Sequence, residues 1–182
     1  MSIVKKLLPM SVEEYLDGER QSDVRHEYVD GEIYAMVGAS SAHNMLCVSL
    51  TTAFSNQLKG SGCQVFASDM KVRLNNEFYY PDVMVVCDKI DTAAYYQTEP
   101  VLIVEVLSES TKKRDRFEKR LAYQKLESLK EYALVSQDKM QIEIIRRMKA
   151  DWRVETYVGN DTVCFQSISL EVSIEEIYEN VL

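Results

Sequence analysis

The sequence predicts an α/β (α+β) fold in which a central mixed β-sheet is flanked by helices. One observation is the run 101–107, which is apolar apart from a single carboxylate and is therefore typical of a strand buried on both faces of a sheet. Another is the order of the patterns along the chain: a hairpin, a helix, three strand-like runs, a second helix and further strands. This order favours a mixed sheet with helices on its faces.

The first expected elements are a short helix and a β-hairpin, over residues 11–16, 25–29 and 32–37. Ser11 and Glu14 have the spacing of a capping box, which opens a helix. Asp30-Gly31 supplies the tight turn of the hairpin.

A long helix is expected to start at Ser40 or Ser41, either of which offers an N-cap, and to end at Gly60 and Gly62. Its apolar residues recur at roughly helical spacing, namely Met45, Val48, Leu50, Phe54 and Leu58.

Three strand-like runs follow, over residues 64–74, 78–87 and 101–107. Pro81 in the second run suits a strand entry or an irregular edge, because proline donates no backbone hydrogen bond. A helix over 111–129 is expected next, with Phe117, Leu121 and Leu129 facing inward. Further strands and a short terminal helix are expected over 131–136, 141–147, 153–158 and 173–178.

Length and composition predict one globular domain over residues 1–182. A chain of 182 residues fits a single domain of the common size of roughly 100–200 residues, and no linker or repeat divides it. With 46% hydrophobic and 27% charged residues, the composition is that of a soluble protein. Neither a membrane span nor a signal peptide is recognisable, so we expect a cytoplasmic protein without a membrane partner.

The four cysteines, Cys47, Cys63, Cys87 and Cys164, lie far apart and form no CxxC pair, and the chain has only two histidines. This pattern indicates neither a structural zinc site nor a disulfide framework. We therefore expect reduced, mostly buried thiols.

The net charge of −8 disfavours passive coating of a nucleic-acid backbone, because non-specific binding depends on cationic side chains that displace counterions. One segment departs from this average, since it collects Lys112, Lys113, Arg114, Arg116, Lys119 and Arg120. A local basic patch is therefore expected within an acidic protein.

Glu105 is the most informative residue, because an unpaired buried charge costs several kcal/mol. A basic partner, protonation or a metal ion must compensate it. Asp82 has a comparable apolar setting after Tyr80-Pro81, so two adjacent strands would bring two acids together. The alternative is that Glu105 turns outward at a strand end and Asp82 caps a turn. For Asp115 and Lys119, four residues apart, the alternative is a solvated ion pair on an exposed helix.

Taken in order, these motifs resemble the Uma-type restriction endonucleases, a bacterial branch of the PD-(D/E)xK nuclease superfamily. The matching features are Tyr80-Pro81-Asp82, the run 100–108 with Glu105, and the four-residue steps Asp115, Lys119 and Tyr123. The hairpin 28–32 preceded by Glu27, and the later His43, also match. The resemblance covers about residues 11–178 and implies a restriction endonuclease-like fold.

The resemblance implies that Asp82, Glu105 and the backbone carbonyl of Val106 hold a divalent ion, Mg²⁺ or Mn²⁺. The superfamily places a lysine two residues after the second acid, whereas this chain has Leu107 there. Lys119, on the following helix, is the expected substitute. Its stripe with Asp115 and Tyr123 drifts only some 40° per four-residue step.

Supporting roles are expected for several further residues. Glu27 would act as a catalytic carboxylate and extend the acidic site, and the alternative is a structural hairpin carboxylate. His43, Asp115 and Tyr123 would assist. The alternatives are that His43 is simply a hydrogen-bonded residue near a helix start and that Tyr123 is a packing residue. Lys112, Lys113, Arg114 and Arg116 would bind nucleic acid.

The resulting function is a metal-dependent endonuclease that hydrolyses DNA, with a homodimer as the expected assembly. The alternatives are a catalytically silent nuclease-fold module for nucleic-acid binding or assembly, and a phosphoesterase for a small phosphate ester.

Overall fold

The structure is a computed structural model that describes residues 9–88, 90–109 and 111–182. In this described part, six strands form a central sheet in the order β11-β10-β9-β8-β6-β3. β8 and β9 run parallel, whereas the other neighbours are antiparallel, so the sheet is mixed. The strands are β3 (Gln64–Ala67), β6 (Val83–Val86), β8 (Pro100–Leu107), β9 (Glu131–Ser136), β10 (Gln141–Arg147) and β11 (Trp152–Val158).

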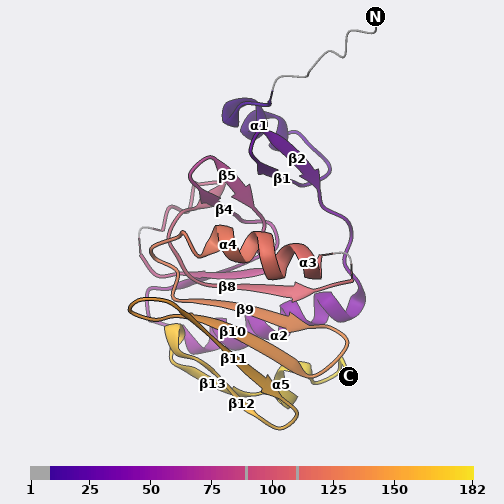
Figure 1. Cartoon of the computed structure of the whole chain (residues 1–182), viewed down its shortest axis with the longest axis vertical. Coiled ribbons are helices and arrows are strands. Elements are labelled where there is room, and N and C mark those ends of the chain that lie inside the picture. Colours follow the sequence, from indigo (N-terminus) through magenta and orange to yellow (C-terminus); the bar gives the residue numbers. More distant parts are fainter. Residues whose placement is uncertain (1–8, 89, 110) are drawn as a thin grey trace, which may run out of the picture.

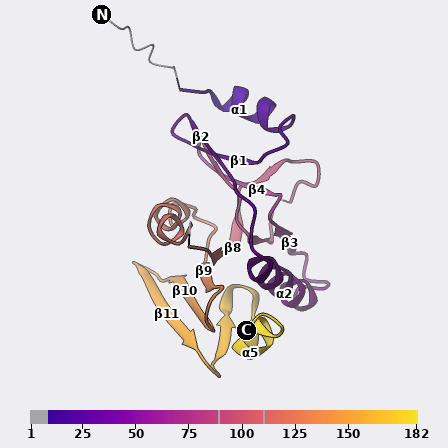
Figure 2. The same cartoon turned by 90° about the vertical axis from the view of Figure 1, so that its right-hand side faces the viewer.

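Helices cover the two faces of this sheet (Figures 1 and 2). On one face α2 (Ser41–Gln57), capped by Ser40, buries Leu46, Leu50 and Phe54 against apolar side chains of β6, β8 and β9. On the other face lies a helical segment that we call the 112–123 helix. It consists of α3 (Lys112–Arg114), a π-helical turn η1 (Asp115–Lys119) and α4 (Arg120–Tyr123).

A second sheet lies at the N-terminal end of the molecule and has the described strand order β2-β1-β5-β4-β7 (Figure 1). Helix α1 (Val12–Glu19) packs on it through Tyr15, which stacks on Tyr28 and contacts Phe78. The strands are β1 (His26–Val29), β2 (Glu32–Ala35), β4 (Lys71–Leu74), β5 (Glu77–Tyr79) and β7 (Tyr96–Gln97).

The C-terminal segment packs beside α2 on the first face of the central sheet. It comprises β12 (Thr162–Phe165), a 3₁₀ turn η2 (Gln166–Ile168), β13 (Leu170–Ser173) and α5 (Ile174–Tyr178). The expected mixed α/β architecture is confirmed. The expected capping box, the Asp30-Gly31 hairpin, the N-cap at Ser40 and the terminal helix are all present.

Two predicted strands are each divided between the two sheets. The run 64–74 breaks at Ser68, which adopts a left-handed φ of 47°, so that β3 joins the central sheet and β4 the second sheet. The run 78–87 breaks at Tyr80-Pro81-Asp82 into β5 and β6. Asp82 therefore lies immediately before a strand rather than inside one.

The predicted helix 111–129 is wrong in its length and partly in its orientation. Its regular part ends at Tyr123. Phe117 and Leu121 are 63% and 65% exposed instead of facing inward, whereas Leu129 is buried as expected. The cause is that Asp115, Lys119 and Tyr123 face the sheet. Residues two positions away lie about 200° around the helix and must point outward.

The prediction of four reduced cysteines is wrong for Cys63 and Cys87, which form a disulfide. Cys63 precedes β3 and Cys87 follows β6, and these strands pair antiparallel with Gln64 opposite Val86. The strand pairing thus brings together two cysteines separated by 24 positions. Cys47 and Cys164 are free.

Candidate active site

Asp82 and Glu105 lie next to each other at the junction of β6 and β8. These strands pair antiparallel with Val83 opposite Val104, so one step further the register sets Asp82 opposite Glu105. The backbone N–H of Val106 donates to Asp82 Oδ2 at 2.7 Å. Glu105 is 3% exposed within a strand buried along its whole length. The sheet itself thus brings the two predicted acids together.

Glu27 reaches the same place from β1 of the second sheet and is 2% exposed. The backbone N–H of Tyr80 donates to Glu27 Oε1 at 3.1 Å, which ties the hairpin to the segment before Asp82. Arg114 lies 2.6 Å from Glu27 Oε2. The hairpin carboxylate is therefore part of the site, and an arginine of the 112–123 helix holds it.

Lys119 occupies the centre of the site and is buried. Its Nζ lies 2.9 Å from Glu105 Oε1, 2.9 Å from Glu27 Oε1 and 3.6 Å from Asp115 Oδ1. Tyr123 donates its hydroxyl hydrogen to Glu105 Oε1 at 2.9 Å. The π-helical turn that carries Asp115 and Lys119 is a local feature frequently found at functional sites.

Negative charge exceeds positive charge in this arrangement. Four carboxylates, which we call the carboxylate cluster, face two permanent cations, Lys119 and Arg114, which leaves two negative charges uncompensated when His43 is neutral. The cluster consists of Glu27, Asp82, Glu105 and Asp115.

The excess charge and the burial alter the ionisation of the cluster. Burial raises the pKa of Glu105 well above its usual value despite the opposing charge of Lys119, and burial likewise raises the pKa of Asp115. Burial alone would lower the pKa of Lys119, but the charges of Glu105, Glu27 and Asp115 outweigh it, so that its pKa is raised. Lys119 therefore stays protonated, and Glu105 has a strong tendency to take up a proton.

His43 and Cys47 complete the site from the N-terminal turns of α2. His43 Nε2 lies 3.2 Å from Asp82 Oδ2, and His43 Nδ1 lies 3.6 Å from Cys47 Sγ. Burial lowers the pKa of His43, but its hydrogen bond to Asp82 and the Asp82 charge more than compensate, so that the pKa of His43 lies above its usual value. His43 thus contacts the predicted metal-binding carboxylate directly.

These groups line one cavity of about 700 Å³. Its wall includes the predicted residues Glu27, His43, Asp82, Glu105, Asp115 and Lys119. The hairpin and the segment after it add Tyr34 and Val37, which are 41% and 74% exposed. The structure therefore brings together side chains from both sheets and both helical layers around a space large enough for part of a ligand.

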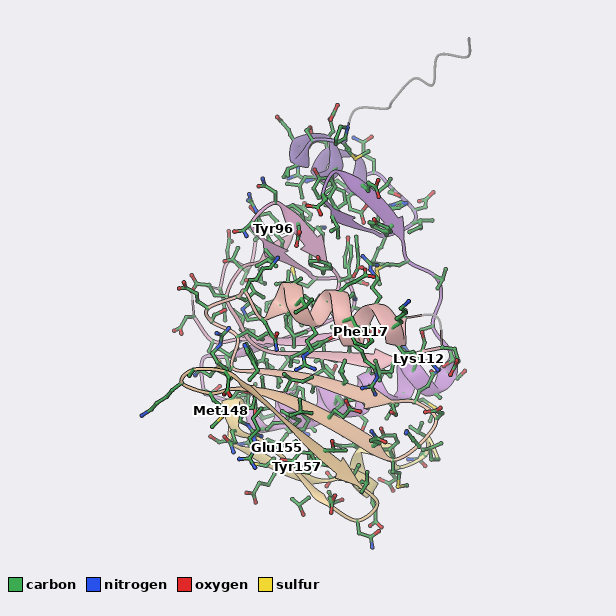
Figure 3. The ribbon with its side chains drawn as sticks, viewed as in Figure 1. Tyr96, Lys112, Phe117, Met148, Glu155 and Tyr157 are labelled. Atoms are coloured by element: carbon green, nitrogen blue, oxygen red, sulfur yellow. A yellow bond between two sulfur atoms is a disulfide. The ribbon has the colours of Figure 1, made fainter. Side chains whose placement is uncertain are left out.

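The expected basic patch is only partly free to meet a nucleic acid. Arg116 makes two hydrogen bonds to Glu143, at 2.6 and 2.8 Å, and Arg114 binds Glu27. Lys112 and Lys113 are exposed, and Lys112 lies 2.7 Å from Glu109. Figure 3 labels Lys112 and Phe117 on the 112–123 helix, in front of the sheet.

Two residues that contribute to the site, Cys47 and Arg114, were not predicted to do so from the sequence. Cys47 was treated only as a buried thiol, although its spacing of four from His43 places both on one face of a helix. Arg114 was assigned only to nucleic-acid binding. No sequence signal predicted its contact with Glu27, because the two residues come from different layers of the fold.

Comparison with known proteins identifies the family. Residues 12–175 match the model of the Uma2 family, whose description is "Putative restriction endonuclease". The chain belongs to the Uma2 family. This Uma2 protein is 38% identical to an uncharacterized protein of Synechocystis sp. over 176 residues, which cover 94% of this chain and 93% of the relative. A second uncharacterized Synechocystis protein is 29% identical over 167 residues, or 88% of this chain and 94% of the relative.

The fold of the Uma2 chain resembles that of a solved structure. The crystal structure of a "putative nuclease belonging to DUF820" from Anabaena variabilis superposes with a TM-score of 0.80 at 17% identity, over 96% of this chain and 100% of the other. The restriction endonuclease-like fold is thereby confirmed. Within the described residues, no helix combines the length and the apolar character that are needed to cross a membrane.

Proposed function

We propose that this Uma2 protein is a metal-dependent endonuclease that hydrolyses phosphodiester bonds of DNA. The observation that supports this most is the cavity in which three members of the carboxylate cluster, Glu27, Glu105 and Asp115, surround the ammonium of Lys119. Family membership makes nuclease chemistry the expected activity.

The residues of the cluster fit a divalent cation. Their donors are carboxylate oxygens, which Mg²⁺ and Mn²⁺ prefer. When all four carboxylates are ionised and His43 is neutral, two negative charges remain uncompensated, and Asp115 Oδ1 is buried without a hydrogen-bond partner among the described residues. In the proposal Asp82, Glu105 and the Val106 carbonyl hold Mg²⁺ or Mn²⁺. When bound, such an ion polarises the scissile phosphate and acidifies a coordinated water.

The other residues of the site prepare the phosphate and the attacking water. Lys119, held against Glu105 and Glu27, provides the fixed positive charge that stabilises the charge developing on the phosphate. Tyr123 orients Glu105 through its hydroxyl group. Glu27 keeps Lys119 and Arg114 in place, and its carboxylate would anchor a water.

The substrate would approach over the exposed part of the 112–123 helix. Lys112 and Lys113 are exposed there and would contact phosphates, whereas Arg114 and Arg116 would first have to release Glu27 and Glu143. Cleavage of both strands of a duplex would suit a homodimer with two such sites.

Purified protein incubated with supercoiled plasmid DNA and millimolar Mg²⁺ or Mn²⁺ tests the proposal. Nicked or linear product is expected with metal and none with EDTA, and Asp82→Asn and Glu105→Gln should both be inactive. RNA and a small phosphodiester are assayed in parallel. Cleavage of the small ester alone would show that the protein is a phosphoesterase and not an endonuclease.

A catalytically silent nuclease-fold module is the second candidate. The ion pairs of Lys119 with Glu105 and Glu27, together with the net charge of −8, favour it. Binding of DNA without cleavage under every metal condition would support this candidate and overturn the endonuclease.

A further inference from the structure

The N-terminal turns of α2 contact Asp82. His43 and Cys47 are four residues apart and share one helical face. One ligand atom from each, together with a carboxylate oxygen of Asp82, lies within 4.8 Å of the others. The side chains of His43 and Asp82 are each 14% exposed, and Cys47 is 5% exposed.

Lys119 does not account for this group. Its ammonium contacts Glu27, Glu105 and Asp115, whereas the imidazole of His43 lies against Asp82. A nitrogen donor thus stands beside the carboxylate that already accepts a hydrogen bond from Val106. The cavity has an all-carboxylate side around Lys119 and a mixed nitrogen and oxygen side at Asp82.

The imidazole is oriented with one nitrogen toward each neighbour. Nε2 faces Asp82 at 3.2 Å, and Nδ1 faces Cys47 Sγ at 3.6 Å. Without a metal, Nε2 donates its hydrogen to Asp82. An ion bound between the two displaces this proton into the solvent, and the ring hydrogen that remains on Nδ1 then points at the sulfur of Cys47. Ligating histidines are commonly held in this way by a partner on the other ring nitrogen.

Imidazole nitrogen suits borderline transition ions such as Co²⁺, Ni²⁺ and Zn²⁺, whereas Mg²⁺ prefers ligands that are oxygen only. We infer that His43 Nε2 joins Asp82 as a metal ligand, positioned by Cys47, so that this site prefers a borderline transition-metal ion to Mg²⁺. The inference rests on the proposed function, because Asp82 is the metal-binding residue common to both.

Ion binding is measured on the full chain without nucleic acid. Isothermal titration with CoCl₂ and with MgCl₂ gives the two affinities for the wild type, His43→Ala, Cys47→Ala and His26→Ala. His26 is the matched control, because it is the other of the two histidines and lies on β1 of the second sheet, against Glu19 of α1. The wild type should bind Co²⁺ more tightly than Mg²⁺.

The variants should separate the two ions. His43→Ala should weaken Co²⁺ binding by about 100-fold and Mg²⁺ binding far less, and Cys47→Ala should weaken Co²⁺ binding by roughly 10-fold. His26→Ala should bind both ions as the wild type does. His43→Asp supplies an all-oxygen set and should shift the preference toward Mg²⁺.

A measurement on the wild type covers the case in which a variant does not fold. With two histidines in the chain, proton NMR should show paramagnetic shifts of the His43 ring on addition of Co²⁺ and none of the His26 ring. Unshifted His43 resonances at saturating Co²⁺, unchanged Co²⁺ affinity in His43→Ala, or tighter binding of Mg²⁺ than Co²⁺ by the wild type would each overturn the inference.

Failure of this inference is distinguishable from failure of the proposed function. A protein that cuts DNA but whose Co²⁺ affinity is indifferent to His43 overturns the inference alone. A protein that binds Co²⁺ through His43 but leaves all nucleic acids and esters intact supports the inference and overturns the endonuclease.

Discussion

Two clusters of buried charge lie on the central sheet, and they are built differently. The first is the carboxylate cluster with Lys119. The second, which we call the Arg146 network, joins Arg146 on β10 to Glu131 on β9 at 2.8 Å. Both central carboxylates are almost inaccessible, since Glu105 is 3% and Glu131 1% exposed. Burial alone does not distinguish the two clusters.

Hydrogen bonding does distinguish them. Glu131 also accepts from the backbone N–H groups of Gln166 and Ser167 and from the Ser167 hydroxyl. Arg146 also donates to Glu155 and to the carbonyl of Cys164. These bonds link β9 and β10 to the C-terminal segment, so a role in packing accounts for the buried charges of the Arg146 network. The carboxylate cluster also accepts hydrogen bonds from backbone N–H groups, those of Tyr80 and Val106, but these bonds do not balance its charge.

When all four carboxylates are ionised and His43 is neutral, the carboxylate cluster retains two uncompensated negative charges. It also has a buried Asp115 oxygen without a hydrogen-bond partner among the described residues, and a cavity of about 700 Å³. A satisfied network stabilises a fold, whereas an unsatisfied one costs stability and so points to a ligand. Imbalance of charge, rather than burial of charge, is therefore the better indicator of a functional site in this protein.

The largest expected effect is a loss of stability when a substitution breaks the Arg146 network. Arg146→Ala leaves Glu131 buried without its cation and should destabilise the fold by about 3–5 kcal/mol, measured by urea unfolding. Glu155→Gln is the control, because Glu155 is partly exposed and should cost far less. A loss for Arg146→Ala no larger than that for Glu155→Gln would contradict the structural role.

Removal of the active-site cation should affect catalysis instead. Lys119→Ala should lower cleavage by roughly 10²–10³-fold, because one preorganised charge on the developing transition state is lost. Lys113→Ala is the matched control on the exposed side of the helix and should only weaken binding in a salt-dependent way. Wild-type cleavage rates in Lys119→Ala would exclude it as the catalytic lysine.

A divalent ion should stabilise only proteins with an intact carboxylate cluster. At an ion concentration 100 times the Kd, the free energy of unfolding should rise by about 2.7 kcal/mol by mass action. Asp82→Asn should abolish this rise, whereas Glu155→Gln should retain it. A thermal melt with and without Mn²⁺ measures the effect, and an equal rise in Asp82→Asn would place the ion elsewhere.

The last expected effect concerns pH. Because the pKa of Glu105 is raised on folding, the folded state binds a proton that the unfolded state has released above about pH 4.5. The contribution of Glu105 to stability is therefore complete below that pH and is lost as pH rises through the folded pKa, by at most about 1.4 kcal/mol per pH unit.

Glu105→Gln removes this titration, so its stability without metal should fall less with rising pH than that of the wild type. Urea midpoints between pH 4.5 and pH 8 measure the difference. Parallel curves for the two proteins would show that Glu105 ionises as easily in the folded state as in the unfolded one.

Local sequence patterns predicted much of the fold correctly because they report interactions between near neighbours. Ser11 with Glu14, Asp30-Gly31 and Ser40 each specify a cap or a turn within a few residues. The division of the two predicted strands between the sheets was missed because the hydrophobic pattern is the same on both sides of Ser68 and of Pro81. Which sheet a strand joins depends on partners far away in the chain.

The sequence by itself determined that Glu105 is a carboxylate in a strand buried on both faces and that Asp115, Lys119 and Tyr123 form one helical stripe. It also carried the family resemblance. The buried strand and the helical stripe follow from periodicity and composition, which are properties of short segments.

Only the tertiary structure decided which charges meet. Glu27, Glu105, Arg114 and Lys119 come from a hairpin, a strand and a helix, and their contacts at 2.6–2.9 Å depend on how these elements pack. The same holds for the Cys63–Cys87 disulfide and for His43 beside Asp82. Ion pairs and hydrogen bonds act over a few ångströms in space, and no spacing along the chain encodes that distance.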